Sequence, residues 1–215
     1  MAESRRLPGR RALRLAAAGL ALALAAGCAS SGADGASSTD GGYHGAVLDQ
    51  QYVVPETPLV DTDGEPFSLA DDTDEPLTLV FFGYTNCPDI CQAVLASLAS
   101  AKTRLDEADR ERVEVVFVTT DPARDDEAAV RDYLDRFDPE FIGLTGDLDT
   151  IIEVGRPLAV AVEKGERLPS GGYEVTHGTQ VTAVTSDDRV PLVWTQGTSS
   201  AQFAEDIHRL LQDGA

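Results

Sequence analysis

The 215-residue chain is poor in the residue types that bind soft metals or carry redox chemistry, with three cysteines, three histidines and one methionine. It is also poor in positive charge, with 17 Lys and Arg against 37 Asp and Glu and a formal net charge of −20. Such a chain repels a phosphate backbone, which argues against nucleic-acid binding. Apolar residues still make up 42% of the sequence, enough for the core of one domain with appendages.

The first 27 residues have the pattern of a targeting segment. Five arginines precede an apolar run, Leu15 to Ala26, which is too short to cross a bilayer comfortably but suits a signal peptide. The run ends in Leu24-Ala25-Ala26-Gly27-Cys28, which resembles a bacterial lipobox. This resemblance implies that Cys28 is lipidated, becomes the first mature residue and anchors an exported protein to the outer face of the cell membrane. Ordinary signal cleavage near Ala25–Ala29 is the alternative, and the arginine pairs leave Sec and twin-arginine export both open.

Three segments are therefore expected: a lipoprotein-type signal peptide over 1–27, a flexible tether over 28–52 and a folded domain over 53–215. The tether is predicted because residues 29–45 are mostly Ser, Gly, Ala and Asp. His44 lies at the end of this stretch, where we expect it to be exposed and without a functional role.

The domain sequence predicts a single α/β domain with a mixed central sheet flanked by helices and an N-terminal hairpin. Its apolar runs alternate between strand-like and helix-like patterns, and Ser199 and Gln202 have the spacing of a capping box before the last helix. A polar, Gly-rich excursion is expected over 164–172. The expected strands are 77–82, 113–119, 141–144, 158–162, 181–185 and 190–194; the expected hairpin is 59–69, and the expected helices begin near 88, 130, 148 and 200.

Two of the three cysteines lie in the stretch that leads from the strand at 77–82 into the next helix. Cys87 and Cys91 are four residues apart, which on a helix places both sulfurs on one face, and Pro88 suits a first helical position. The free N–H groups at a helix N-terminus favour thiolate over thiol. A purely structural disulfide over one turn would contribute little stability, because so short a loop removes little chain entropy. The pair therefore indicates either a soft-metal site or a dithiol–disulfide couple.

A metal site needs at least one further ligand, and histidine is the most suitable. His208 lies in the amphipathic C-terminal helix, where we expect packing or solvent exposure. His177 precedes the strand that follows Thr179, but the sequence does not give the strand order that would place it relative to the cysteines.

The segment Phe82 to Cys91 resembles the signature of the Sco/SenC family of copper-binding assembly proteins. Later pieces of the chain agree with the same family in order and spacing, and the resemblance covers about residues 55 to 212. These pieces are Thr120 to Asp125, Tyr133 to Phe137, Phe141 to Gly146 and Tyr173 to His177.

The resemblance implies a thioredoxin-like fold in which Cys87, Cys91 and His177 bind one copper ion, as Cu(I), Cu(II) or both. It implies a metallochaperone rather than an enzyme, with copper delivery to, or thiol reduction of, the binuclear centre of cytochrome c oxidase. The implied partner is the copper-bearing subunit of that oxidase or another copper protein. Asp121 is expected near the site, or else as the cap of the turn before Pro122.

The chain departs from the family pattern at Gln92, which follows Cys91, and at Thr176 and Gly178, which flank His177. Such neighbours tune the affinity and potential of a metal site.

The main alternative is a thiol–disulfide oxidoreductase that reduces partner cysteines before metallation. The CxxxC spacing, and the absence of a proline just before Thr179, weigh against a general oxidoreductase of the thioredoxin kind. A peroxidase is disfavoured because Thr85 and Asn86 supply only a fragment of a peroxide site. Zinc bound by two cysteines and a histidine is a further option.

Overall fold

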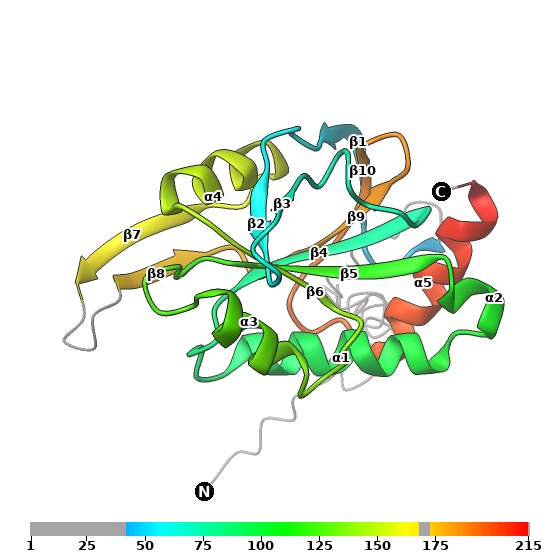
Figure 1. The fold of residues 1–215 in the computed structure, drawn as a ribbon. Coiled ribbons are helices and arrows are strands. Elements are labelled where there is room, and N and C mark those ends of the chain that lie inside the picture. Colours follow the sequence, from blue (N-terminus) through cyan, green and yellow to red (C-terminus); the bar gives the residue numbers. More distant parts are fainter. Residues whose placement is uncertain (1–41, 168–172, 215) are drawn as a thin grey trace, which may run out of the picture. The chain divides into compact units, whose positions relative to one another are not determined.

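A mixed eight-stranded sheet forms the centre of the fold (Figure 1). The computed structural model describes residues 42–167 and 173–214, with the backbone alone over 163–167 and 173–177. The predicted signal peptide, Cys28, the tether up to residue 41 and residues 168–172 of the expected excursion lie outside the described residues. Within the described part, no helix has both the length and the apolar character needed to cross a bilayer.

The sheet has the strand order β1-β10-β9-β4-β5-β6-β2-β3. Its three central strands β4, β5 and β6 are parallel, whereas β9 pairs antiparallel with β4, which confirms the predicted mixed sheet. The hairpin predicted at 59–69 is present as β2–β3, and the strands predicted at 181–185 and 190–194 pair with each other as β9–β10. The strands are β1 Ala46–Val53, β2 Leu59–Asp61, β3 Pro66–Phe67, β4 Leu77–Gly83, β5 Val113–Thr119, β6 Ile142–Thr145, β9 Val181–Thr185 and β10 Arg189–Trp194.

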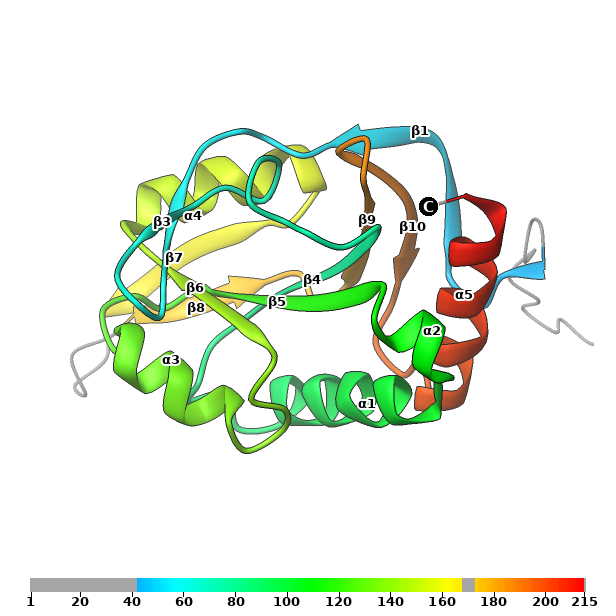
Figure 2. The ribbon, with the colours of Figure 1, turned by 45° about the vertical axis from the view of Figure 1, so that its right-hand side comes forward.

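Helices cover both faces of this sheet (Figures 1 and 2). Leu79 and Phe81 of β4 face one core, which α1, α3 and α5 cover, while Val80 and Phe82 face a second core closed by α4. Because both faces of β4 are buried, its sequence is continuously apolar instead of alternating. The helices are α1 Ile90–Arg104, α2 Glu107–Arg110, α3 Glu127–Leu134, α4 Leu148–Gly155 and α5 Ser200–Asp213.

Capping groups fix where several helices begin. The predicted capping box is confirmed at the start of α5, where the Ser199 side chain accepts from the Gln202 N–H and the Gln202 side chain accepts from the Ser199 N–H. The Asp126 side chain accepts from the Ala129 N–H at the start of α3.

Two predictions about segments are wrong. Residues 46–52 of the expected tether belong to β1, which pairs with β10, so the folded part begins before residue 53. The strand expected over 158–162 does not form, because a short 3-10 helix, Arg156–Leu158, ends there and Ala159 has a left-handed backbone with φ 54°. The chain instead extends from Val162, and β7 Val162–Arg167 pairs with β8 Tyr173–His177 as a separate two-stranded ribbon.

Candidate functional site

The two cysteines lie beyond the carboxyl end of β4, as predicted, but not on one helix. α1 begins only at Ile90, with Asp89 as its N-cap, so Pro88 is not a helical residue and the prediction that placed it there is wrong. Cys87 lies in the preceding turn, where its N–H donates to the Tyr84 carbonyl at 3.2 Å. The Cys91 N–H nevertheless donates to Cys87 Sγ at 3.4 Å, so the turn brings the pair together without a shared helical face.

The two thiols are free and have different environments. Cys87 retains 5% exposure, whereas Cys91 is fully buried. Burial alone would raise the pKa of Cys87, but hydrogen bonds from the Cys91 thiol and from backbone N–H groups of residues 89–91 outweigh it and lower that pKa. Burial raises the pKa of Cys91, to which its hydrogen bond with Cys87 adds. Cys87 is therefore the thiol that ionises first.

Gly83 allows the sheet to approach the buried thiol closely. A Cβ on Gly83 would lie 2.8 Å from the Phe117 ring, closer than packed atoms allow, and 3.1 Å from Cys91 Sγ, which is a tight contact. A side chain at the end of β4 would therefore displace Cys91 or the ring beneath it.

Residues 84–89, between β4 and α1, form the loop that carries Cys87 and is called the cysteine loop below. A buried carboxylate for which the sequence gives no role, Asp125, connects this loop to the end of the neighbouring strand β5. Asp125 is fully buried and accepts hydrogen bonds from the Thr85 N–H at 2.9 Å and the Thr85 hydroxyl at 2.5 Å. It also accepts from the Thr119 hydroxyl at 2.6 Å. Its negative charge contributes to the raised pKa of Cys91. The available signal was its position at the end of the Thr120–Asp125 segment.

Asp121, the carboxylate that the sequence analysis expects near the site, forms part of the turn after β5. Its carbonyl accepts from the N–H groups of Arg124 and Asp125, both at 3.0 Å, and its side chain pairs with the Arg124 guanidinium. The adjacent Thr120 reaches the end of β4, where its N–H and its hydroxyl both donate to the Gly83 carbonyl. The contacts of Asp121 place it in the turn after β5, while its expected proximity to the site stays a prediction.

The side chain of His177 lies outside the described part of the structure, so its role as a ligand stays a prediction. The backbone of His177 is described, and it lies at the end of β8, opposite Val162. Three residues separate it from β9, which begins with Val181 paired to Phe81. Because β9 runs antiparallel to β4, the segment after His177 enters the sheet at the carboxyl end of β4. Beside that segment, a cavity of about 290 Å³ is lined by both Thr179 and Ile90, the first residue of α1.

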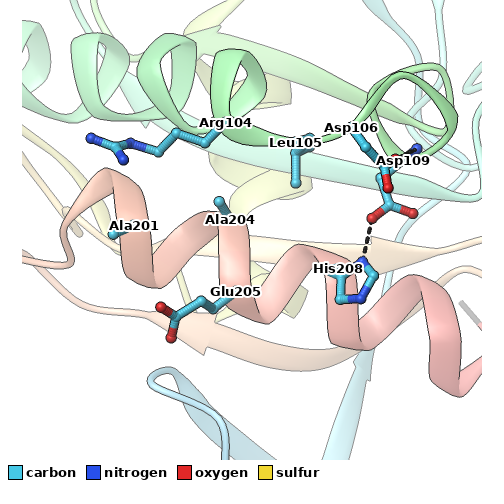
Figure 3. Close-up of a pocket in the computed structure, with 8 residues that line it drawn as sticks. All are labelled: Arg104, Leu105, Asp106, Asp109, Ala201, Ala204, Glu205 and His208. Carbon is cyan, nitrogen blue, oxygen red and sulfur yellow. Dashed lines mark hydrogen bonds and ion pairs between the residues drawn. The ribbon is translucent and has the colours of Figure 1, made fainter.

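The other two histidines lie against carboxylates on α2 and α5. Figure 3 shows His208 of α5 facing Asp109, with a dashed line between the two side chains. His208 Nδ1 lies 2.5 Å from Asp109 Oδ2, and both residues line a pocket of about 440 Å³ that no cysteine among the described residues lines. His44 Nε2 lies 2.8 Å from Glu205 Oε2. Among the described side chains, no group of three or more His, Cys, Asp or Glu is arranged to hold a metal ion.

Residues 46–212 match the family model described as SCO1/SenC. The chain belongs to the SCO1/SenC family. It is 33% identical over 152 residues to the mouse (Mus musculus) Protein SCO2 homolog, mitochondrial, covering 70% of this chain and 59% of that protein. It is 31% identical over 145 residues to a Stutzerimonas stutzeri protein named "Putative copper-binding protein", covering 66% of this chain and 68% of that protein. The chain thus spans less than two thirds of the length of the mouse protein.

Solved SCO1/SenC structures share the fold. The apo Sco1 protein of Thermus thermophilus is 29% identical with a TM-score of 0.70, covering 78% of this chain and 96% of that one. The Arabidopsis thaliana ScoI structure with copper bound is 26% identical with a TM-score of 0.68, covering 75% of this chain and 99% of that one. The predicted thioredoxin-like α/β fold is confirmed by these likenesses together with the strand order.

Proposed function

We propose that this member of the SCO1/SenC family is a copper carrier that holds one copper ion through Cys87, Cys91 and His177. The observation that carries the proposal is the strand order. β9 begins opposite Phe81, so the segment following His177 reaches the sheet at the end beyond which the two cysteines lie.

The donor set suits the proposed cargo. Thiolate sulfur is a soft ligand that favours Cu(I), and imidazole is a good ligand for copper in either oxidation state. The two sulfurs lie at one turn, and the Cys91 N–H donates to Cys87 Sγ at 3.4 Å. Known relatives support the assignment: the Stutzerimonas stutzeri protein is named as copper-binding, and the related Bradyrhizobium japonicum ScoI, 28% identical with a TM-score of 0.64, has been solved with copper bound.

Each residue of this set has a separate task in taking up copper. Cys87, with the lower pKa and the greater exposure, loses its proton first and meets the incoming ion. Cys91 is fully buried with a raised pKa, so its proton leaves as the metal binds. Backbone N–H groups of residues 89–91 hydrogen-bond the Cys87 sulfur and stabilise its negative charge.

The wider role that we propose is assembly of the copper centre of cytochrome c oxidase, with that enzyme's copper-bearing subunit or another copper protein as the recipient. We also propose that the mature protein is attached to the outer face of the cell membrane by lipid on Cys28. The lipobox-like Leu24–Cys28 segment supports this anchor. The mass of membrane-extracted protein tests it: a diacylglyceryl-sized increment on Cys28 is expected, and an unmodified N-terminus at another residue would refute the anchor.

A second candidate function is the reduction of partner cysteines before metallation. The specific observation in its favour is the hydrogen bond between the two free thiols, which places both sulfurs needed for a disulfide side by side. The two functions use the same sulfurs and are separated by the requirement for His177, which thiol exchange does not need.

Titration of the reduced protein with Cu(I), in competition with a chromophoric chelator, tests the copper site. We expect about one copper per chain in the wild type, from the ligand set. Cys87→Ser and Cys91→Ser should each abolish high-affinity binding, since a hydroxyl is a poor ligand for Cu(I). Ser100→Cys is a matched control, because it adds a sulfur on α1 nine residues after Cys91 without changing the proposed ligands. Equal binding by wild type and both serine variants would refute the proposal.

A further inference from the structure

We propose that Asp125 is a positioning residue for the Cys87–Cys91 pair, and that it acts through Thr85. The Asp125 carboxylate is fully buried and accepts from both the N–H and the hydroxyl of Thr85, at 2.9 and 2.5 Å. Thr85 lies two residues before Cys87, in the loop between β4 and α1. Asp125 lies 40 positions further along the chain, so these bonds fix the loop to a separate part of the fold.

Helix capping does not account for a carboxylate at this position. α3 is capped by the next residue, Asp126, whose side chain accepts from the Ala129 N–H at 2.8 Å. Burying an ionised carboxylate is costly unless hydrogen bonds satisfy it. At Asp125, two of the three described donors belong to one residue of the cysteine loop, and the third is the Thr119 hydroxyl.

The turn that carries Asp125 is itself firmly held, so it can act as a fixed point. The Asp125 N–H donates to the Asp121 carbonyl at 3.0 Å, and the Thr145 hydroxyl of β6 donates to the Asp125 carbonyl at 2.9 Å. The second bond links the turn to β6, and the Thr119 hydroxyl at the end of β5 donates to the Asp125 carboxylate. The carboxylate is therefore held from one side by the sheet, and it holds the cysteine loop on the other.

The consequence concerns the position of one sulfur relative to the other. Cys91 is fixed in α1, while Cys87 lies in the loop, so the 3.4 Å contact from the Cys91 N–H to Cys87 Sγ depends on where the loop is held. Releasing Thr85 lets Cys87 move away from Cys91. This lowers the effective concentration of one sulfur at the other and disfavours any state that needs both.

A metal-free thiol–disulfide equilibrium measures this positioning directly. Incubation with glutathione disulfide oxidises the two protein thiols to one intramolecular S–S bond and breaks the glutathione S–S bond, and the two thiol protons pass to the two glutathione molecules released. The equilibrium constant rises with the effective concentration of the two sulfurs. The inference deepens the proposed function, since the same sulfurs would hold copper, but this measurement contains no metal.

Three threonine variants separate positioning from stability. Thr85→Val removes the hydroxyl that bonds the carboxylate, and we expect it to lower the equilibrium constant about tenfold. Thr85→Ser keeps the hydroxyl and should stay within about twofold of the wild type. Thr145→Val is the matched control: it removes one buried hydrogen bond to the same turn, without touching the carboxylate or the cysteine loop. It should lower the free energy of unfolding but leave the equilibrium constant within about twofold.

Asp125→Asn should lower the equilibrium constant at least as far as Thr85→Val; if this variant does not fold, the threonine series decides. The inference is overturned if Thr85→Val leaves the constant unchanged, if Thr145→Val lowers it equally, or if Thr85→Ser fails to restore it. In a parallel titration, Thr85→Val should bind Cu(I) about tenfold more weakly than the wild type. If the wild type binds no copper, the proposed function fails while the glutathione result still decides the role of Asp125.

Discussion

At Gly83, the last residue of β4, the sheet packs closely against the candidate site. The space beside it is filled by the Phe117 ring and by Cys91 Sγ, which a Cβ would meet at 2.8 and 3.1 Å. Packing of this kind is sensitive to one added carbon, because core atoms are displaced only at a cost in free energy.

We therefore predict that Gly83→Ala lowers the free energy of unfolding by about 1–3 kcal/mol, the usual cost of overpacking. It should also weaken Cu(I) binding, because Cys91 is displaced from its position beside Cys87. Urea unfolding and chelator competition measure the two effects. An alanine variant with unchanged stability and unchanged binding would show that the contact at Gly83 is not tight.

At the level of single residues, the sequence identified the sulfurs but not what holds them. Cys87 and Cys91 could be found from their spacing and from the preceding apolar run. The prediction for Pro88 was wrong because α1 begins two residues later, a difference that helix propensity does not determine. Asp125 was missed because its bonds to Thr85 join residues 40 positions apart, and no local pattern reports such a contact.

Three elements meet at Asp206 on α5. Its buried carboxylate accepts from the Trp194 indole N–H at 2.7 Å, at the end of β10, and from the N–H groups of His44 and Gly45 at 2.9 Å, just before β1. This junction connects the edge strand β1 to the rest of the domain. These bonds explain why residues 46–52, which the sequence predicts to be part of the tether, pair with β10 as strand β1.

Asp206→Ala should lower the free energy of unfolding by at least about 2 kcal/mol, because it leaves buried donors without an acceptor. Amide exchange should accelerate in β1 before it does in β4, since β1 has only β10 as a neighbouring strand. Glu205→Gln is the matched control, because Glu205 is an exposed neighbour whose ion pair with His44 contributes little. Comparable destabilisation by the two variants would refute the special role of Asp206.

α2 and α5 are linked by a titratable pair, Asp109 and His208 (Figure 3). The hydrogen bond and the charge of Asp109 raise the pKa of His208 above its ordinary value of 6.5. The contribution of the Asp109–His208 pair to the free energy of unfolding is therefore fully present below about pH 6.5, the ordinary pKa of histidine. It is lost as the pH rises through the pKa of His208 in the folded state.

The urea midpoint of the wild type should accordingly exceed that of His208→Gln by more at about pH 5.5 than at about pH 9, where the imidazole is neutral. Measuring both proteins at each pH removes the contribution of all other titrating groups. A difference that does not change with pH, or that grows as the pH rises, would contradict the assigned pair.

Across the domain as a whole, the sequence predicted the class of fold better than its connections. The runs at 77–82 and 113–119 became β4 and β5, because a strand buried on both faces has an unmistakably apolar sequence. The β7–β8 ribbon was missed because its strands are short and polar and depend on each other for pairing. The position of β9 beside β4, which relates His177 to the cysteines, is a property of the strand order that no single segment encodes.

The proposed copper site depends most on His177, because two sulfurs alone would fit either a copper carrier or an oxidoreductase. The most direct measurement is copper titration of wild type and His177→Ala, with His208→Ala as a matched control that removes a histidine paired with Asp109 instead. We expect wild type and His208→Ala to bind about one copper per chain, and His177→Ala to bind at least about tenfold more weakly. Equal affinity in wild type and His177→Ala, or no binding by any of the three, would contradict the proposed copper site.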